Sequence, residues 1–225
     1  MAPGCAPMGD RRDGAAPAPA PGRYPIGSAD RVILIGKTGS GKTTLALHYL
    51  TRQSRVVLVD PKAVLALPGW PIVTGAAFAR AFPREPRVIW RPTPGLALPA
   101  QFAEFDSVCR RIFELGQTTL YVDEVSLVAS HTRQPPWFNA IHQQGRQRGI
   151  GAWVATQRPR RIPPTVIAES EHAIIFRLNL RADRDLVAEN IGAEVGVPSL
   201  PFGYLYWHAG LTAPVECAPL DRIHV

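Results

Sequence analysis

The stretch GKTGSGKT at residues 36–43 decides the fold, because it satisfies the pattern G-x-x-x-x-G-K-[ST] in full. Its glycines allow backbone amides to turn inward around an anion, and a following helix directs its positive end at the same point. The run RVILI at 31–35 indicates a buried strand before this stretch. The run TTLALHYL at 43–50 has helical spacing of apolar residues. Strand, glycine-rich turn and helix in this order predict a phosphate-binding loop.

Each residue of this loop has an expected role at a nucleotide and a metal ion. We expect the phosphates of ATP to be bound by Gly36, Lys37, Thr38, Gly39, Ser40, Gly41, Lys42, Thr43 and Thr44. Lys42 should reach the β- and γ-phosphates and act in catalysis, and the Thr43 hydroxyl should ligate Mg²⁺. The predicted ligands are therefore ATP and Mg²⁺.

A second motif, TTLYVDE at 118–124, delivers an acidic pair to the end of a predicted strand. Asp123 can hold Mg²⁺, directly or through water. Glu124 is placed to polarise a water molecule for in-line attack on the γ-phosphate. An acidic pair after a strand is often a solvated turn, but its combination with the loop at 36–43 favours a catalytic role. The adjacent glutamate and the lack of an N-K-x-D base-reading motif favour hydrolysis over GTPase signalling.

Gln157 is the third candidate, because it directly follows the apolar run AWVA at 152–155 and Thr156. A strand there would place its amide at the carboxyl edge of the sheet, beside the nucleotide. That amide can sense the γ-phosphate or position the attacking water. The alternative is an ordinary loop glutamine.

The rest of the chain predicts strands that alternate with helices. Further strands are expected at 55–59, 87–90 and 172–178, helices at 101–115, 136–148 and 183–191, and a terminal β-hairpin from 204–207 and 213–217. This order is typical of an α/β fold whose mainly parallel sheet has helices on both faces, a three-layer α/β/α arrangement. Residues 1–24, rich in Pro, Ala and Gly, predict a disordered tail, and residues 25–225 a single domain.

Composition restricts the class of protein. No apolar run approaches the roughly twenty residues of a membrane span, and the first residues lack the layout of a signal peptide. The cysteines at 5, 109 and 217 show no metal-ligand spacing, which favours reduced thiols. We therefore expect a cytoplasmic protein without a membrane partner, in the host cytoplasm if the protein is viral.

The net charge of +7 is concentrated in one segment. Residues 133–184 contain nine arginines against Glu169, Glu171 and Asp183. Arginine-rich surfaces suit phosphate, whether it belongs to a nucleotide or to a nucleic acid backbone. The alternative is a solvated surface with no ligand.

Together, GKTGSGKT at 36–43, VVLVDPK at 56–62, TTLYVDE at 118–124, GRQRGIG at 145–151 and ATQRP at 155–159 resemble the FtsK/HerA superfamily of DNA-pumping ATPases. The resemblance implies a RecA-like P-loop (ASCE) fold, with the loop strand central and an additional strand between it and the Mg²⁺-aspartate strand. It implies Lys42 and Thr43 at phosphate and metal, Asp123 at metal, Glu124 as base and Gln157 as sensor.

The same resemblance implies partners. Superfamily members form homo-oligomeric rings, here a pentamer or hexamer, that move double-stranded DNA without regard to sequence. Arg146, in its G-R-x-x-G segment, is similar to an arginine finger that enters a neighbouring subunit's nucleotide, and Arg148 is the competing candidate. In its short length, the chain is most similar to a viral or phage DNA-packaging ATPase. Such an ATPase would dock on a capsid portal or another protein.

Two other functions remain open on the sequence. One is a P-loop assembly or adaptor protein of the filamentous-phage, zonula-occludens-toxin type, which would bind nucleotide without pumping DNA. The other is a metabolic kinase, which requires a lid or an acceptor-binding motif that the sequence lacks.

Overall fold

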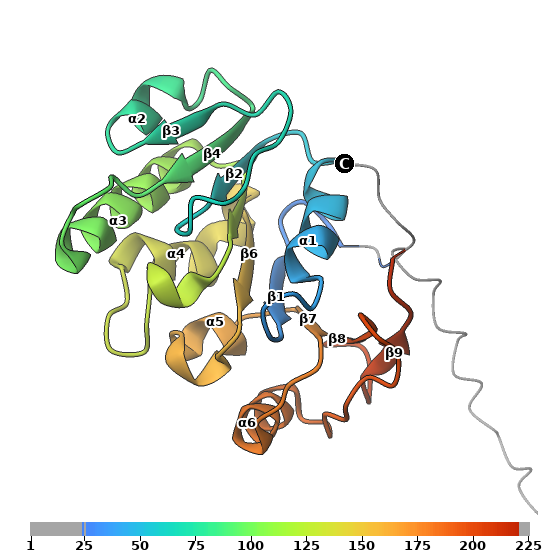
Figure 1. Ribbon diagram of the computed structural model, residues 1–225. Helices are drawn as coiled ribbons and strands as arrows, with labels where there is room; N and C mark the ends of the chain where they lie inside the picture. The colour runs from blue at the N-terminus through green and yellow to red at the C-terminus, as the bar shows by residue number, and fades with distance from the viewer. Residues whose placement is uncertain (1–23, 25, 221–225) are drawn as a thin grey trace, which may run out of the picture.

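A nine-stranded sheet runs through the part of the chain that the computed structural model describes, Tyr24 and residues 26–220 (Figure 1). Its strands are β1 (Arg31–Ile35), β2 (Val56–Val59), β3 (Ile72–Thr74), β4 (Arg87–Arg91), β5 (Thr119–Val122), β6 (Gly151–Thr156), β7 (His172–Ile175), β8 (Tyr204–His208) and β9 (Val215–Cys217). The α-helices are α1 (Lys42–Leu50), α2 (Ala77–Ala81), α3 (Leu98–Leu115), α4 (Pro136–Gln144), α5 (Pro164–Ala168) and α6 (Arg181–Ile191). Short 3-10 helices are η1 (Val125–Leu127), η2 (Gly145–Arg148) and η3 (Pro159–Arg161).

The strand order is β3-β4-β2-β5-β6-β1-β7-β8-β9, and all pairs from β3 to β7 are parallel. The predicted α/β fold with a mainly parallel sheet is confirmed. β6 lies between β1 and β5, as the resemblance implied for the additional strand. β8 and β9 add antiparallel to this sheet, so the expected terminal hairpin is confirmed as well.

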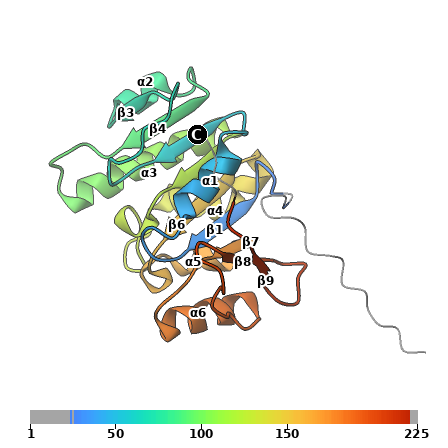
Figure 2. The same cartoon turned by 45° about the vertical axis from the view of Figure 1, so that its right-hand side comes forward.

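Alternate residues of the buried strands pack on opposite faces of the sheet. On β1, Val32 and Leu34 belong to the core under α1, whereas Ile33 and Ile35 belong to the core under the remaining helices. The two views agree that α1 stands on one side of the sheet, with α3, α4 and α5 on the other (Figures 1 and 2). The expected three-layer arrangement, with helices on both faces of the sheet, is therefore confirmed. Among the described residues, α1 is the only α-helix on its face of the sheet.

Several elements differ from the sequence expectation. β3, α2 and α5 were not expected, since each is only three to five residues long and too short to show a period. The helix expected over 136–148 ends at Gln144 and continues as the 3-10 helix η2. Gly149 then ends it in a left-handed conformation, with φ 68°.

Tyr24 belongs to the folded domain and not to the predicted tail. Its ring stacks on Tyr206 with centroids 3.4 Å apart, and its hydroxyl lies 2.7 Å from the Cys217 sulfur. The rest of the tail expected at 1–24 lies outside the described residues, as do Pro25 and residues 221–225.

His142 on α4 makes stability depend on pH. Burial lowers its pKa to about 4, although the Phe138 carbonyl, 3.1 Å from Nδ1, favours the protonated ring. An unfolded histidine has a pKa near 6.5, so between pH 6.5 and about 4 the unfolded chain binds a proton that the folded chain does not. Stability should therefore fall as the pH falls through this window, by about 3 kcal/mol at full extent.

We expect the His142→Met variant to lose correspondingly less stability than the wild type between pH 7 and pH 4. Urea unfolding at a series of pH values measures this difference, and the other titrating groups are common to both proteins. Equal losses of stability in the two proteins would contradict the assignment to His142.

Candidate active site

The phosphate-binding loop and the ends of β5 and β6 open into one cavity of about 970 Å³ at the carboxyl edge of the parallel strands. The cavity is lined by Thr38, Gly39, Ser40, Gly41, Lys42, Thr43, Thr44, Leu45, Lys62, Val64, Leu65, Asp123, Glu124, Gln157, Phe176, Phe202, Tyr204, Pro219 and Leu220. The structure thus brings together the predicted loop, the acidic pair and the predicted sensor. Gly36 and Lys37 belong to the same loop just before these residues.

The loop is fixed between β1 and α1 by close packing at its first glycine. The Gly36 amide donates to the Thr156 carbonyl at 3.1 Å, and a Cβ at this position would lie 2.6 Å from the Phe176 Cβ. The buried Lys42 ammonium donates to the carbonyls of Gly36 at 2.7 Å and Lys37 at 2.9 Å. Burial lowers the pKa of Lys42, while Glu124 and Asp123 oppose this shift. The lysine is therefore held inside the loop beside two carboxylates.

Thr43 and Asp123, the two expected Mg²⁺ ligands, are in contact. The Thr43 hydroxyl donates to Asp123 Oδ1 at 2.8 Å, and the Tyr121 hydroxyl donates to the same oxygen at 2.7 Å. Burial raises the pKa of Tyr121, and the charge of Asp123 raises it further, so the phenol stays a donor. Mg²⁺ takes hard oxygen ligands and is usually held by one or two carboxylates together with phosphates. A hydroxyl and a carboxylate in contact fit such an ion.

Glu124 is buried and sits in a strained backbone conformation, with φ 66°. Its Oε1 accepts from the hydroxyls of Ser126 at 2.7 Å and Thr156 at 3.3 Å, and lies 3.4 Å from the Gln157 amide nitrogen. These contacts fix the carboxylate at the end of β5 and place it beside Gln157. The two residues that the sequence assigned to water activation therefore adjoin each other.

Lys62 is a site residue that the sequence analysis did not single out. Its ammonium lies 3.6 Å from Glu124 Oε2 and lines the cavity. The loop that carries it is anchored by the fully buried Asp60, which accepts from the amides of Val64 and Leu65 and from the Arg91 guanidinium. The motif VVLVDPK contained both residues, but only the pairing of β2 with β5 shows that Lys62 reaches Glu124.

An apolar group forms the other flank of the cavity and was also missed. It consists of Phe176, Phe202, Tyr204, Pro219 and Leu220. The rings of Phe176 and Tyr204 are 5.5 Å apart, and both side chains are buried. These residues come from segments up to 44 positions apart in the sequence (176 to 220), so no local pattern could have gathered them.

Arg146 and Arg148 do not lie in the cavity. Both belong to η2, which precedes β6 and therefore lies at the opposite, amino edge of the sheet. Arg146 is mostly exposed and pairs with Glu171. Arg148 donates to the Phe113 carbonyl at 2.7 Å and stacks its guanidinium over the Phe113 ring. Any contact of either arginine with a nucleotide requires a second subunit.

A curated relative matches most of the chain. It is the DNA packaging ATPase P9 of Enterobacteria phage PRD1, 28% identical over 208 residues, which covers 84% of this chain and 87% of P9. The chain is homologous to a viral DNA-packaging ATPase. This homology confirms the predicted resemblance to a viral DNA-packaging ATPase and bears out the prediction of a P-loop ATPase. No protein-family model matches the sequence.

Solved structures confirm the P-loop NTPase fold. The genome packaging NTPase B204 of Sulfolobus turreted icosahedral virus 2, solved with ATP-gammaS, aligns with a TM-score of 0.69 and 17% identity over 87% of this chain and 100% of B204. The N-terminal domain of zonular occludens toxin from Neisseria meningitidis aligns with a TM-score of 0.50 and 16% identity, covering 86% of this chain and 95% of that domain. The fold is thus more similar to B204 than to the toxin domain.

Gly36 offers a test of the packed loop. The Gly36→Ala variant should lower nucleotide affinity on the order of tenfold, equivalent to about 1.4 kcal/mol, because its Cβ forces the loop away from the Phe176 Cβ. Gly192→Ala is the matched control, since Gly192 ends α6 with φ 66° and a Cβ there meets nothing within 4 Å. The control variant should be less stable than the wild type but should bind nucleotide with the same affinity. Titration with a fluorescent ATP analogue checks both variants, and equal affinities would contradict the packing argument.

Proposed function

We propose that this protein is an Mg²⁺-dependent ATPase that drives double-stranded DNA into a capsid. The observation that carries the proposal is the convergence of Lys42, Thr43, Asp123, Glu124 and Gln157 on one cavity, in a chain homologous to a packaging ATPase over most of its length. The proposed location is the cytoplasm of the host cell. None of the helices in the described part of the chain has the length and apolarity to cross a membrane.

The residues of the cavity have separate roles in hydrolysis. Lys42 and the loop backbone hold the phosphates of ATP, and Glu124 accepts the proton of the water that attacks the γ-phosphorus in line. The side-chain amide of Gln157 orients that water, since its backbone lies against the same carboxylate. Lys62 and the donors on Oε1 keep Glu124 in place.

Thr43 and Asp123 would hold Mg²⁺, and the hydrogen bond from the Tyr121 hydroxyl would orient the Asp123 carboxylate. The ion supplies charge neutralisation for the phosphates when it is bound. The described residues contain no cluster of three or more His, Cys, Asp or Glu side chains suited to a metal. A site that shares its ion with phosphates does not require such a cluster.

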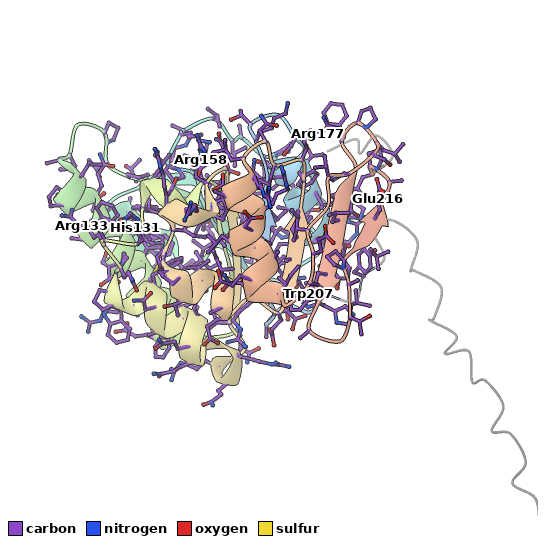
Figure 3. The ribbon with its side chains drawn as sticks, turned by 90° about the horizontal axis from the view of Figure 1, so that it is seen from below. His131, Arg133, Arg158, Arg177, Trp207 and Glu216 are labelled. Atoms are coloured by element: carbon purple, nitrogen blue, oxygen red, sulfur yellow. The ribbon has the colours of Figure 1, made fainter. Side chains whose placement is uncertain are left out.

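A basic surface beside the cavity supports DNA as the partner. The loops that follow β5 and β6 are joined by a hydrogen bond of 3.1 Å from the His131 amide to the Arg161 carbonyl. They carry His131, Arg133, Arg158, Arg160 and Arg161, and the loop after β7 adds Arg177. Figure 3 shows Arg158 and Arg177 in the upper part of the view, with His131 and Arg133 to the left of Arg158. Such arginines bind phosphate backbone without reading sequence.

A homo-oligomeric ring, pentamer or hexamer, would complete the site. In such a ring Arg146 would enter the nucleotide of a neighbouring subunit, where a guanidinium stabilises charge on the γ-phosphoryl group. We favour Arg146 over Arg148, because Arg148 is bound to the end of α3 and stacked on Phe113. A capsid portal or a similar viral protein would dock the ring.

Linear double-stranded DNA of any sequence should stimulate the ATPase activity of the assembled protein. Stimulation should weaken steeply between about 50 and 200 mM salt, because binding releases counterions from the DNA. Phosphate release is the measurement, and oligomeric state is determined on the same sample. The Glu124→Gln variant is the control: it should bind ATP but hydrolyse it at least about 100-fold more slowly. Slow hydrolysis that DNA does not affect would instead favour the assembly or adaptor protein.

The Arg146→Ala variant should abolish turnover while leaving nucleotide binding intact. A trans-acting arginine contributes about 10³-fold or more to the rate in related phosphoryl-transfer enzymes. Arg148→Ala is the matched control and should retain most activity. Mixing Arg146→Ala with Glu124→Gln subunits should restore part of the activity, since some interfaces then combine an intact arginine with an intact glutamate. Wild-type turnover by Arg146→Ala protein would remove this residue from the active site.

A further inference from the structure

The order of the strands fixes which end of the cavity receives which end of ATP. β6 and β5, which carry Gln157 and the acidic pair, lie on one side of β1, whereas β7 and β8 lie on the other. The phosphate loop follows β1 itself. If the γ-phosphate faces Glu124, the nucleoside extends toward β7 and β8. The aromatic flank of the cavity is therefore the place where the base arrives.

Phe202 is the exposed member of this flank. Its side chain is 64% exposed, although large apolar side chains are usually buried, and it lines the cavity together with the buried Phe176 and Tyr204. Pro219 and Leu220 line the same region from the segment after β9. A nucleobase has two apolar faces, and an exposed phenyl ring in an apolar part of the cavity offers a surface for stacking.

The backbone at Phe202 has a left-handed conformation that is unusual for phenylalanine. Leu200 to Gly203 form a turn closed by a 3.0 Å hydrogen bond from the Gly203 amide to the Leu200 carbonyl. Pro201 occupies the second position, as is usual, but the third position has φ 58° and carries phenylalanine where glycine or asparagine is normal. A bulky residue in this conformation is strained, and such strain clusters at ligand sites. The ring is mostly exposed, so buried packing offsets little of the strain.

We propose that Phe202 stacks on the nucleobase of the bound nucleotide, and that the site accepts nucleoside triphosphates with little regard to the base. The inference rests on the proposed ATPase function and deepens it by naming the substrate class. Among the described residues of the aromatic flank, no side chain carries a carboxylate or an amide that could read the hydrogen-bonding edge of a base, and the Tyr204 hydroxyl is buried. Stacking tolerates every base, because each has a π-face.

The test compares wild type with Phe202→Ala and Phe202→Gly in equilibrium titrations with ATP, GTP, CTP and inorganic tripolyphosphate. In wild type, we expect the dissociation constants of the nucleotides to lie within about tenfold of one another, since stacking discriminates weakly. Both variants should weaken every nucleotide by about tenfold, the loss of one base–aromatic contact. Both should bind tripolyphosphate as wild type does, and kcat should change little while KM rises.

Two comparisons separate stacking from a general effect on the fold. Phe202→Gly should unfold at a higher temperature than Phe202→Ala, because glycine relieves the left-handed strain, yet bind nucleotide equally weakly. Val197→Ala, which removes an exposed apolar side chain from the same loop outside the cavity, should bind ATP as wild type does.

Unchanged nucleotide affinity in Phe202→Ala would overturn the stacking role, and a preference for ATP over GTP and CTP of about 100-fold or more would overturn the broad substrate class. An equal loss of tripolyphosphate binding would also overturn the stacking role, because the effect would then lie in the phosphate loop. These failures differ from failure of the proposed function, in which wild type itself hydrolyses no nucleotide.

Discussion

The parallel pairing of β5, β6 and β1 is the constraint on which the site depends. In this register Ile35 lies beside Thr156 and Val122 beside Val154, so the three strands end together at one edge of the sheet. The next residue or two on each strand are Gly36, Asp123–Glu124 and Gln157. A slip of one residue in any strand would turn its buried side chains toward the opposite face, so the hydrophobic cores hold the register. The same packing that stabilises the sheet thus brings the phosphate loop, the carboxylates and the amide into contact.

The hydrogen bonds at this edge make the site one unit. Asp123 Oδ1 accepts from Thr43 on α1 and from Tyr121 on its own strand, while Glu124 Oε1 accepts from Thr156 at the end of β6. A change at the phosphate loop therefore reaches the carboxylates directly. Through Glu124 it also reaches η1 and the loop after it, which is hydrogen-bonded to the basic segment at 158–161. These contacts connect the cavity to the loops whose arginines we propose for DNA binding.

The predicted residues share one property: each can be recognised from its neighbours in the chain. The phosphate loop, Asp123–Glu124 and Gln157 all come directly after strands that their apolar residues predict, and the carboxyl end of a buried strand is where such residues become functional. Lys62 and Phe202 could not be recognised in this way. Lys62 reaches Glu124 because β2 pairs with β5, and Phe202 reaches the cavity because β8 turns back beside β7. Both facts depend on strand order, which a single sequence does not specify. Arg146 is the opposite case. Its motif can be recognised in the sequence, but the nucleotide that it is expected to contact belongs to another subunit.

Strained backbone conformations occur on both flanks of the cavity. The described residues with positive φ that are not glycine are Ala63, Gln117, Glu124 and Phe202. Glu124 and Phe202 line opposite flanks of the cavity, and Ala63 joins the lining residues Lys62 and Val64. Each such residue costs about 1–3 kcal/mol, and a domain of marginal stability retains that cost where the surrounding structure enforces it and selection has a use for it. Gln117 lies outside the cavity, and its backbone amide donates to the Arg148 carbonyl at 2.9 Å. The strain at Phe202 has no explanation in the packing, which is why a ligand is the better explanation for it.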